Sequence, residues 1–219
     1  MLDFNEMVTN FVSREQKAKQ IGRYYPSEIG SCLRKVWYGY KHPQAVSPEL
    51  LKIFAAGNIV HEFVVEVLKS EKNKHVQLLE EELPFKHEMD GFVISGRIDD
   101  LVLLKHDNKK VLVEVKSAKS TEHLDEPKLS NEIQLILYMH LLGIHDGVLL
   151  YVDKTNLQSK VFTVPYSQKR GEEILQRFKN LDTALRANEL PLPEAKEIEG
   201  INWMCRFCEY AQMCDKNEK

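Results

Sequence analysis

The sequence contains no apolar run that approaches 18 residues, which argues against a membrane-spanning helix. It also has no excess of basic charge, because 30 Lys and Arg stand against 33 Asp and Glu and the formal net charge is −3. That balance excludes a polypeptide that is basic throughout, such as a chromatin or ribosomal protein, although a basic face remains compatible with it. No internal repeat or low-complexity tract is visible in the 219 residues. We therefore expect a soluble, cytoplasmic globular domain with no membrane partner.

Cysteine is scarce and unevenly distributed. Three of the four cysteines, Cys205, Cys208 and Cys214, fall close together near the C-terminus, whereas Cys32 lies far upstream. In a cytoplasmic chain, clustered thiols indicate metal binding more often than disulfides. Four thiolates can hold a tetrahedral zinc ion or an iron–sulfur cluster. A zinc ribbon usually has two C-x2-C pairs, and this sequence has one.

Hydrophobic periodicity divides the domain into an N-terminal helical part with the first cysteine (1–46), a central part (47–188) and a C-terminal cysteine segment (189–219). The first part is predicted to contain a helix over about 2–20, then a turn and short helix at 26–38. A long helix follows within 47–70. Its start is marked by Ser47 as N-cap and by Pro48 at the first helical position.

From about residue 76 the hydrophobic period changes from helical to strand-like. The predicted elements of this part are strands at 75–85, 91–105 and 109–118, a buried helix at about 130–143, strands at 147–154 and 160–167, and a helix with Ile174, Phe178, Leu181 and Leu185 on one stripe. A sheet with helices before and after it predicts an α/β or α+β domain.

Two neighbouring predicted strands carry two carboxylates and an ammonium. Residues two apart on a strand share a face, so Glu114 and Lys116 are expected to project together while Val113 and Val115 face the opposite layer. Asp99 lies on the preceding strand and can join them. Such a group at a sheet edge suits a divalent cation, with the lysine placed to hold a water or a phosphate oxygen. A plain cross-strand salt bridge is the alternative.

Two helices add further polar candidates. His61 follows Gly57 by one helical turn, and the missing side chain of the glycine leaves room for the imidazole. Gln134 and Tyr138 stand four residues apart and present two hydrogen-bonding groups on one side of the buried helix. Taken alone, His61 fits a satisfied core histidine, and the other two fit ordinary helix polarity.

The order of these pieces resembles the RecB-like branch of the PD-(D/E)xK nuclease superfamily over residues 57–138: Gly57-xxx-His61, Gly96-x-Ile98-Asp99, Glu114-x-Lys116 and Gln134-xxx-Tyr138. The resemblance implies a restriction-endonuclease-like αβββαβ core with a central mixed sheet flanked by helices. It also implies a metal-dependent phosphodiesterase that cuts DNA.

By this resemblance, Asp99 and Glu114 ligate Mn²⁺ or Mg²⁺ with the Val115 carbonyl and His61, and Lys116 orients or deprotonates the attacking water. The imidazole favours Mn²⁺ as well as Mg²⁺, because nitrogen suits later transition metals better than magnesium.

Two further helix residues have implied roles, and one acid is a rival ligand. Gln134 and Tyr138 position the site and the strand being cut. Asp100 competes with Asp99, which we prefer because the family motif places the acid three residues after the glycine.

The cysteines extend the resemblance. A lone upstream cysteine with a C-terminal C-x2-C-x5-C resembles the iron–sulfur nucleases of this superfamily, which include CRISPR-associated RecB-like exonucleases and nuclease subunits of recombination helicase–nucleases. It implies a [4Fe–4S] cluster that clamps the C-terminal tail to the N-terminal helical segment, with zinc as the alternative, through Cys32, Cys205, Cys208 and Cys214. A helicase is excluded because no G-x-x-x-x-G-K-[ST] loop occurs.

The substrate implied is single-stranded DNA or DNA ends. Arg34, Trp37 and Tyr38 combine a cation with aromatic rings, as single-strand binding requires, although the two aromatics also fit a helix core. The family resemblance implies 5′→3′ exonuclease activity that processes DNA for CRISPR spacer acquisition, alongside integrase complex proteins. The alternatives are a general repair or recombination nuclease, and a DNA-binding assembly module whose cutting is secondary. The oligomeric state is left open.

Overall fold

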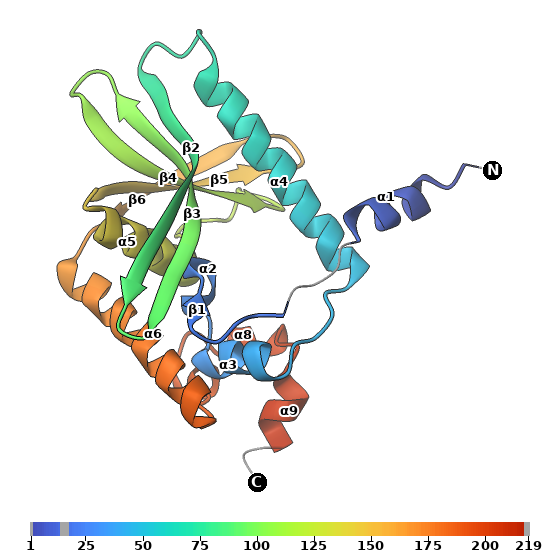
Figure 1. Cartoon of the computed structure of the whole chain (residues 1–219). Helices are drawn as coiled ribbons and strands as arrows, with labels where there is room; N and C mark the ends of the chain where they lie inside the picture. The colour runs from blue at the N-terminus through green and yellow to red at the C-terminus, as the bar shows by residue number, and fades with distance from the viewer. Residues whose placement is uncertain (1, 14–17, 217–219) are drawn as a thin grey trace.

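The sheet is organised around one long strand, β3 (Phe92–Leu104), in the computed structural model, which describes residues 2–13 and 18–216 (Figure 1). One edge of β3 pairs antiparallel with β2 (Val76–Met89). The other edge pairs antiparallel with β4 (Lys109–Ala118) only from residue 100 onward, and parallel with β1 (Arg23–Tyr24) at residues 93 and 94. Between these two pairings β3 and β4 separate, and we call this point the fork.

Beyond the fork the sheet continues as a mixed sheet. β4 pairs parallel with β5 (Asp146–Asp153), and β5 pairs antiparallel with β6 (Ser159–Pro165). A parallel pair needs a crossover between its strands. Here α5 (Leu129–Leu142) supplies that crossover.

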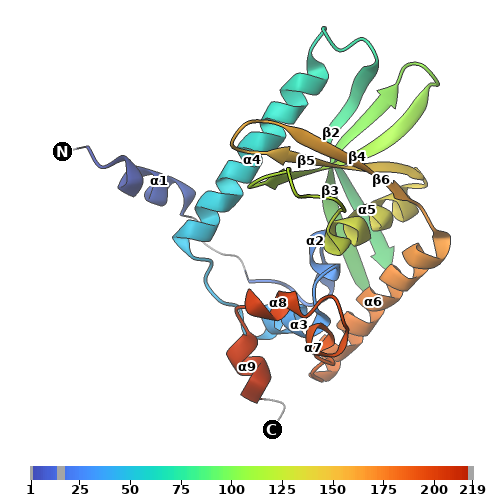
Figure 2. The same ribbon diagram turned by 180° about the vertical axis from the view of Figure 1, so that it is seen from behind.

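Helices cover both faces of the sheet. On one face, Val60 and Val64 of α4 (Pro48–Lys69) pack against Val113 and Val115 of β4. On the other face lie α5, whose residues 135–139 are buried, and α6 (Gln168–Ala187), with Figures 1 and 2 showing α4 and these helices on opposite sides. The predicted mixed sheet flanked by helices is therefore confirmed.

The long helix α4 begins as the sequence predicts. The Ser47 side chain accepts a hydrogen bond from the Leu50 N–H at 3.2 Å, and Pro48 occupies the first turn. This cap satisfies a donor that has no partner within the helix.

The N-terminal helix is shorter than predicted. α1 (Phe4–Val12) ends where Ser13 Oγ donates to the Thr9 carbonyl at 2.7 Å, and the non-helical residues 18–20 follow later in the chain. Residues 14–17 of the predicted helix lie outside the described residues. In α1 only Val12 is buried, so packing adds little to the helix, and a short helix is marginal without packing.

The turn and short helix predicted at 26–38 is two helices, α2 (Pro26–Ile29) and α3 (Leu33–Lys41). Gly30 separates them and lies against the start of α5. A Cβ at this position would come within 2.6 Å of the Ser130 backbone, so only glycine allows this approach.

The C-terminal segment folds back onto the N-terminal helices. It contains α7 (Glu194–Glu197), α8 (Trp203–Arg206) and α9 (Ala211–Lys216), and Figure 2 shows α7 and α8 beside α3. Arg177 of α6 contacts both Glu194 carboxylate oxygens at 2.7 and 3.1 Å, and Glu194 Oε2 accepts the Leu33 N–H at 2.9 Å. These half-buried polar contacts join α3 and α6 to the C-terminal segment. No helix in the described part of the chain is long and apolar enough to cross a membrane.

Candidate active site

Asp99 and Glu114 meet where β3 and β4 separate. The last paired residues before the fork are Asp100 and Val113, so the next position on each strand brings Asp99 beside Glu114. Asp99 Oδ2 accepts the Val115 N–H at 2.8 Å, which replaces a ladder hydrogen bond lost as the strands part. Glu114 and Lys116 lie on one face of β4, and Val113 and Val115 lie on the other, as predicted. The predicted sheet edge is wrong, because β4 lies between β3 and β5.

Glu114 is a buried carboxylate of the fork with only one of its two oxygens hydrogen-bonded. Its side chain is buried, with 1% of the residue exposed, and its Oε1 accepts a hydrogen bond from Lys116 Nζ at 2.6 Å. Its Oε2 is buried without a hydrogen-bond partner. Burial, and then the Asp99 carboxylate, raise the pKa of Glu114, whereas Lys116 opposes the rise. A buried oxygen without a partner costs about 1–3 kcal/mol, so the protein alone does not satisfy this group.

His61 reaches the fork from α4. Its Nδ1 lies 3.4 Å from Asp99 Oδ1, and this hydrogen bond raises the pKa of the imidazole, while burial opposes the rise. Gly57 lies one turn earlier, where a Cβ would be 3.5 Å from Ser117 Oγ at the end of β4. Because that is an ordinary van der Waals distance, a small side chain would fit here, and the position of His61 does not depend on the glycine.

A chain of hydrogen bonds extends from Lys116 into α5. Lys116 Nζ donates to Gln134 Oε1 at 3.2 Å, Gln134 Nε2 donates to the Tyr138 hydroxyl at 3.1 Å, and that hydroxyl donates to the Arg97 carbonyl at 2.9 Å. The predicted alignment of Gln134 and Tyr138 on one side of α5 is confirmed. The chain connects β4, α5 and β3 across the fork and fixes the position of the ammonium.

Asp100 lies on the opposite face of β3 from Asp99. It is 1% exposed, and its Oδ1 is a second buried oxygen without a hydrogen-bond partner. Burial, and then Asp99, raise the pKa of Asp100 to about 7. Because Asp99 shares the face of Glu114 and Lys116, the geometry favours Asp99 as the ligand, and the assignment stays a prediction.

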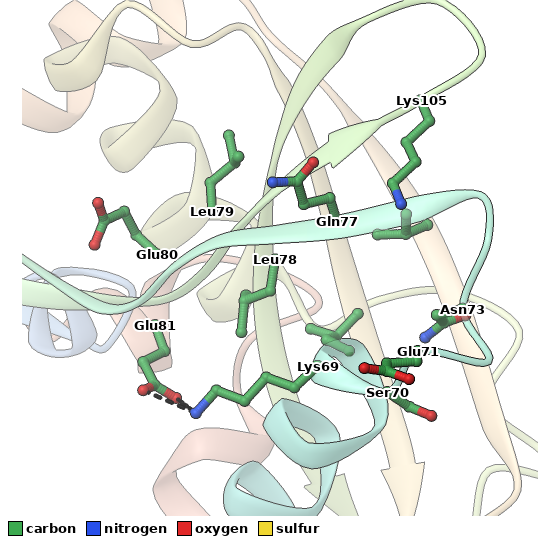
Figure 3. Close-up of a pocket in the computed structure, with 12 residues that line it drawn as sticks. Lys69, Ser70, Glu71, Asn73, Gln77, Leu78, Leu79, Glu80, Glu81 and Lys105 are labelled. Carbon is green, nitrogen blue, oxygen red and sulfur yellow. Dashed lines mark hydrogen bonds and ion pairs between the residues drawn. The ribbon is translucent and has the colours of Figure 1, made fainter.

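A cleft of about 930 Å³ opens between α4 and strands β2 and β3 beside Asp99. Its charged lining residues are His61, Glu62, Glu66, Lys69, Glu81, Glu82, Arg97, Asp99 and Asp100. A second cavity of about 590 Å³ lies at the end of α4 (Figure 3). The two share Lys69 and Glu81, whose ion pair at 2.8 Å is drawn in Figure 3. Asp99 therefore faces an open, mainly acidic cleft.

The donor set of the fork suits a hard divalent cation. In residues 2–13 and 18–216, no group of three or more His, Cys, Asp or Glu side chains is already gathered as a metal site. The fork nevertheless combines Asp99, Glu114 and His61, and the partnerless oxygen of Glu114 is available to a ligand. Carboxylate oxygens with one imidazole match the preferences of Mg²⁺ and Mn²⁺.

The sequence matches the family described as the PD-(D/E)XK nuclease superfamily over residues 15–215. The chain belongs to this superfamily. The nuclease is thus a hydrolase that acts on nucleic acid, from a family that typically uses Mg²⁺ or Mn²⁺. No curated protein matches it.

Solved structures share the fold of the nuclease. The crystal structure of SSO0001 is 20% identical, with a TM-score of 0.62 and coverage of 97% of this chain and 96% of that one. The alkaline exonuclease LHK-Exo from Laribacter hongkongensis is 15% identical, with a TM-score of 0.54 and coverage of 77% and 90%. Its complex with dAMP is also 15% identical, with a TM-score of 0.55 and the same coverage.

The four cysteines of the nuclease line one cavity of about 310 Å³, which we call the cysteine cavity. None of the four forms a disulfide within the described residues. Cys32 comes from the start of α3 and the other three from the C-terminal segment. Burial raises the pKa of the Cys205 and Cys208 thiols. Lys35, Lys196 and Arg206 are among the other lining residues, so cations surround the thiols.

The predicted DNA contacts at Arg34, Trp37 and Tyr38 are wrong in this structure. These residues are 8%, 6% and 1% exposed, so they cannot present cations and rings to DNA. Trp37 Nε1 donates to the Ala184 carbonyl at 3.3 Å, and Tyr38 stacks on Tyr210 with ring centroids 5.4 Å apart. They belong to the core that joins α3 to α6 and the C-terminal segment, which for the two aromatic residues is the stated alternative.

Two contacts that complete the sites were not predicted from the sequence. The Arg97 carbonyl anchors Tyr138, and Arg34 contacts a cysteine of the cysteine cavity. The first depends on how far β3 and β4 remain paired, and the second joins residues 180 apart in sequence. Neither has a local sequence signal.

Proposed function

We propose that this nuclease is a metal-dependent DNA exonuclease that acts on single-stranded ends with 5′→3′ polarity and prepares DNA for CRISPR spacer acquisition. The observation that carries the hydrolytic part is the fork, with Glu114 paired to Lys116 and one buried carboxylate oxygen left without a partner. Phosphodiester hydrolysis needs charge neutralisation at the phosphate and an activated water. The side chains of the fork suit both tasks.

The residues proposed to hold Mg²⁺ or Mn²⁺ are Asp99, Glu114, the Val115 carbonyl and His61. The buried Glu114 Oε2 supports this, because a cation would satisfy an oxygen that has no hydrogen-bond donor. When bound, the cation supplies positive charge at the phosphate and lowers the pKa of a bound water.

Lys116 is proposed to orient the attacking water. An ammonium has three donors, and Glu114 and Gln134 accept two of them at 2.6 and 3.2 Å. The third can be given to a water or to a phosphate oxygen. Both partners are buried and fixed, so the ammonium is already oriented before substrate binds.

Gln134 and Tyr138 are proposed to position Lys116 and the strand being cut. Tyr138 is 2% exposed and packs edge-on against Phe85, with ring centroids 5.3 Å apart. Its hydroxyl joins Gln134 to the Arg97 carbonyl. Because α5 and β3 hold this chain of bonds, Lys116 keeps its position relative to Asp99.

A DNA substrate is supported by the motif order and by the similarity to LHK-Exo, an alkaline exonuclease whose complex with dAMP has been solved. The single-strand preference, the 5′→3′ polarity, the CRISPR role and the integrase partners rest on the family resemblance of the cysteine arrangement.

The cysteine cavity is proposed to hold a [4Fe–4S] cluster ligated by Cys32, Cys205, Cys208 and Cys214. The gathering of all four thiols around one cavity of about 310 Å³ supports a shared ligand. A zinc ion needs its four sulfurs about 2.3 Å from one point, whereas a cluster accepts them at separate corners. The surrounding cations suit the negative charge of a thiolate-bound centre.

The test uses anaerobically purified protein with Mn²⁺ and oligonucleotides labelled at the 5′ or the 3′ end. We expect stepwise release from the 5′ end of linear single strands, slow cutting of blunt duplexes and no cutting of single-stranded circles. Release from the 3′ end would overturn the polarity, and cutting of circles would indicate an endonuclease.

Two variants connect the cutting to the fork. Lys116→Ala should abolish it, whereas Glu126→Gln, which changes an exposed acid in the loop after β4, should cut like the wild type. Full activity in excess EDTA would remove the metal mechanism. A protein that binds DNA but never cuts it would favour the assembly module.

A further inference from the structure

Arg34 joins α3 to the C-terminal segment at the cysteine cavity. The residue is 8% exposed and lies two positions after Cys32. Its Nε donates to the Pro191 carbonyl at 2.6 Å, and its Nη1 donates to Cys214 Sγ at 3.6 Å. One guanidinium thus contacts both the backbone that leads into the C-terminal segment and a thiol near its end.

The contact with sulfur is physically informative. A guanidinium stays charged at all physiological pH values, and burying it is costly unless negative charge or acceptors compensate. A sulfur that carries negative charge as a metal ligand accepts a hydrogen bond from a guanidinium more strongly than a neutral thiol does. Hydrogen bonds to ligand sulfurs also raise the reduction potential of iron–sulfur clusters, because the reduced cluster carries one more negative charge.

The other cations of the cysteine cavity are placed differently. Lys35 pairs with Glu209 at 3.0 Å, and Lys196 pairs with Asp215 at 2.6 Å. Lys196 and Arg206 are exposed, whereas Arg34 is buried. In exposed pairs, water screens the charge strongly, so a buried guanidinium has the larger effect on a sulfur.

We propose that Arg34 is a positioning residue for the iron–sulfur cluster. It holds the Cys214 thiolate in place and stabilises the more negative, reduced state of the cluster. This inference rests on the cluster proposed above, and it assigns to Arg34 a role in the cluster site instead of a role in DNA binding.

The test compares Arg34→Gln, Arg34→Lys and the control Lys179→Gln, which changes an exposed cation of α6 outside the cysteine cavity, in full-length protein purified anaerobically. Iron content, melting temperature and midpoint potential are measured, the last by redox titration followed near roughly 400 nm, where thiolate-bound iron absorbs. The rate of iron loss to a chelator is the fourth measurement.

We expect Arg34→Gln to lower the midpoint potential and to lose iron about 10–100-fold faster, the range typical for loss of an outer-shell partner of a metal ligand. Arg34→Lys keeps the positive charge but loses the planar set of guanidinium donors. Its midpoint potential should therefore lie between those of the wild type and Arg34→Gln, and it should lose iron faster than the wild type. Lys179→Gln should match the wild type. If Arg34→Gln does not fold, Arg34→Lys alone decides.

The results separate two failures. A wild type that carries iron, with Arg34 variants that lose melting temperature at an unchanged potential, would show a purely structural role and overturn this inference alone. A wild type that carries zinc or no metal would overturn both the cluster and the inference.

Discussion

At the fork, the polar side chains come from one stretch of the chain, Asp99 to Tyr138, with His61 added from α4. The cysteine cavity instead joins Cys32 to three cysteines that follow the last long helix. The fork is supported on both faces by buried side chains of the sheet core. The C-terminal segment has short helices and depends on polar contacts such as Arg177 with Glu194.

This difference predicts different consequences of mutation. A fork held by the sheet should keep its shape when one polar group is removed, so activity falls and stability does not. The C-terminal segment should lose its position when a cysteine is removed, so stability falls first and activity follows.

The largest effect is expected at the fork. Glu114→Gln should reduce DNA cutting about 100–1000-fold or more, because a metal ligand contributes several kcal/mol of transition-state stabilisation. Its melting temperature in EDTA should not fall. The carboxylate is buried and one of its oxygens has no hydrogen-bond partner, so replacing it with a neutral amide removes an unfavourable buried charge. Rates on a labelled single strand and thermal melts measure both, with Glu126→Gln as the control. A large loss of stability in Glu114→Gln would contradict the expectation that mutations at the fork lower activity and leave stability unchanged.

The next effect is expected in the cysteine cavity. Cys32→Ala should bleach the iron colour and lower the melting temperature by about 6–12 °C, because a centre that joins the two ends of the chain stabilises it by several kcal/mol. Cutting should fall only as a consequence. Ser31→Ala, whose backbone carbonyl still accepts from Arg177, is the control. Wild-type iron and melting temperature in Cys32→Ala would remove Cys32 from the ligand set.

The fork should also make metal-free stability depend on pH. The pKa of Asp100 is about 7 in the folded protein against 3.8 ordinarily, and the pKa of Glu114 is also raised. The stabilising contribution of a raised pKa is complete below the unfolded value and is lost as pH rises through the folded value. In EDTA, the free energy of unfolding should therefore fall between about pH 4 and pH 7, by at most about 4 kcal/mol for Asp100.

Two comparisons sharpen the pH prediction. Asp100→Asn should flatten the dependence measured by urea unfolding in EDTA. Mn²⁺ should also reduce it in the wild type, because a cation replaces the proton at Glu114. A free energy that rises from pH 4 to pH 7 in EDTA would contradict the burial of these acids.

The smallest effect is expected in the chain of hydrogen bonds. Tyr138→Phe removes the hydroxyl that joins Gln134 to the Arg97 carbonyl, and it keeps the ring that packs on Phe85. We expect kcat to fall about 10-fold with KM little changed, since Lys116 is displaced rather than removed. Steady-state kinetics on a single-stranded substrate tests this. An unchanged kcat would mean that Lys116 needs no support from α5.

The sequence predicts those parts of both regions that depend on local periodicity. Alternation along β4 places Glu114 and Lys116 on one face, helical spacing aligns Gln134 with Tyr138, and Ser47 starts α4. These features follow from strand and helix geometry alone. Local periodicity therefore predicts much of the sheet and most of the polar side chains of the fork.

The rest depends on contacts between distant segments. Asp99 bonds to the Val115 N–H only because the pairing of β3 with β4 begins at Asp100 and leaves Asp99 outside it, and the length of a strand pairing has no local sequence signal. Trp37 and Tyr38 have the composition of a DNA-binding surface, yet α6 and the C-terminal segment cover them. Whether such residues lie on the surface or in the core depends on the segments that pack on them, and the local sequence does not show those segments.

The most direct test of the central claim is a calorimetric titration of Mn²⁺ into the wild type, Asp99→Asn and Asp100→Asn, each with its iron intact. We expect the wild type to bind Mn²⁺, Asp99→Asn to lose this binding, and Asp100→Asn to retain it. Retained binding in Asp99→Asn together with lost binding in Asp100→Asn would contradict Asp99 as the ligand, and a wild type that does not bind Mn²⁺ would contradict the fork as the metal site.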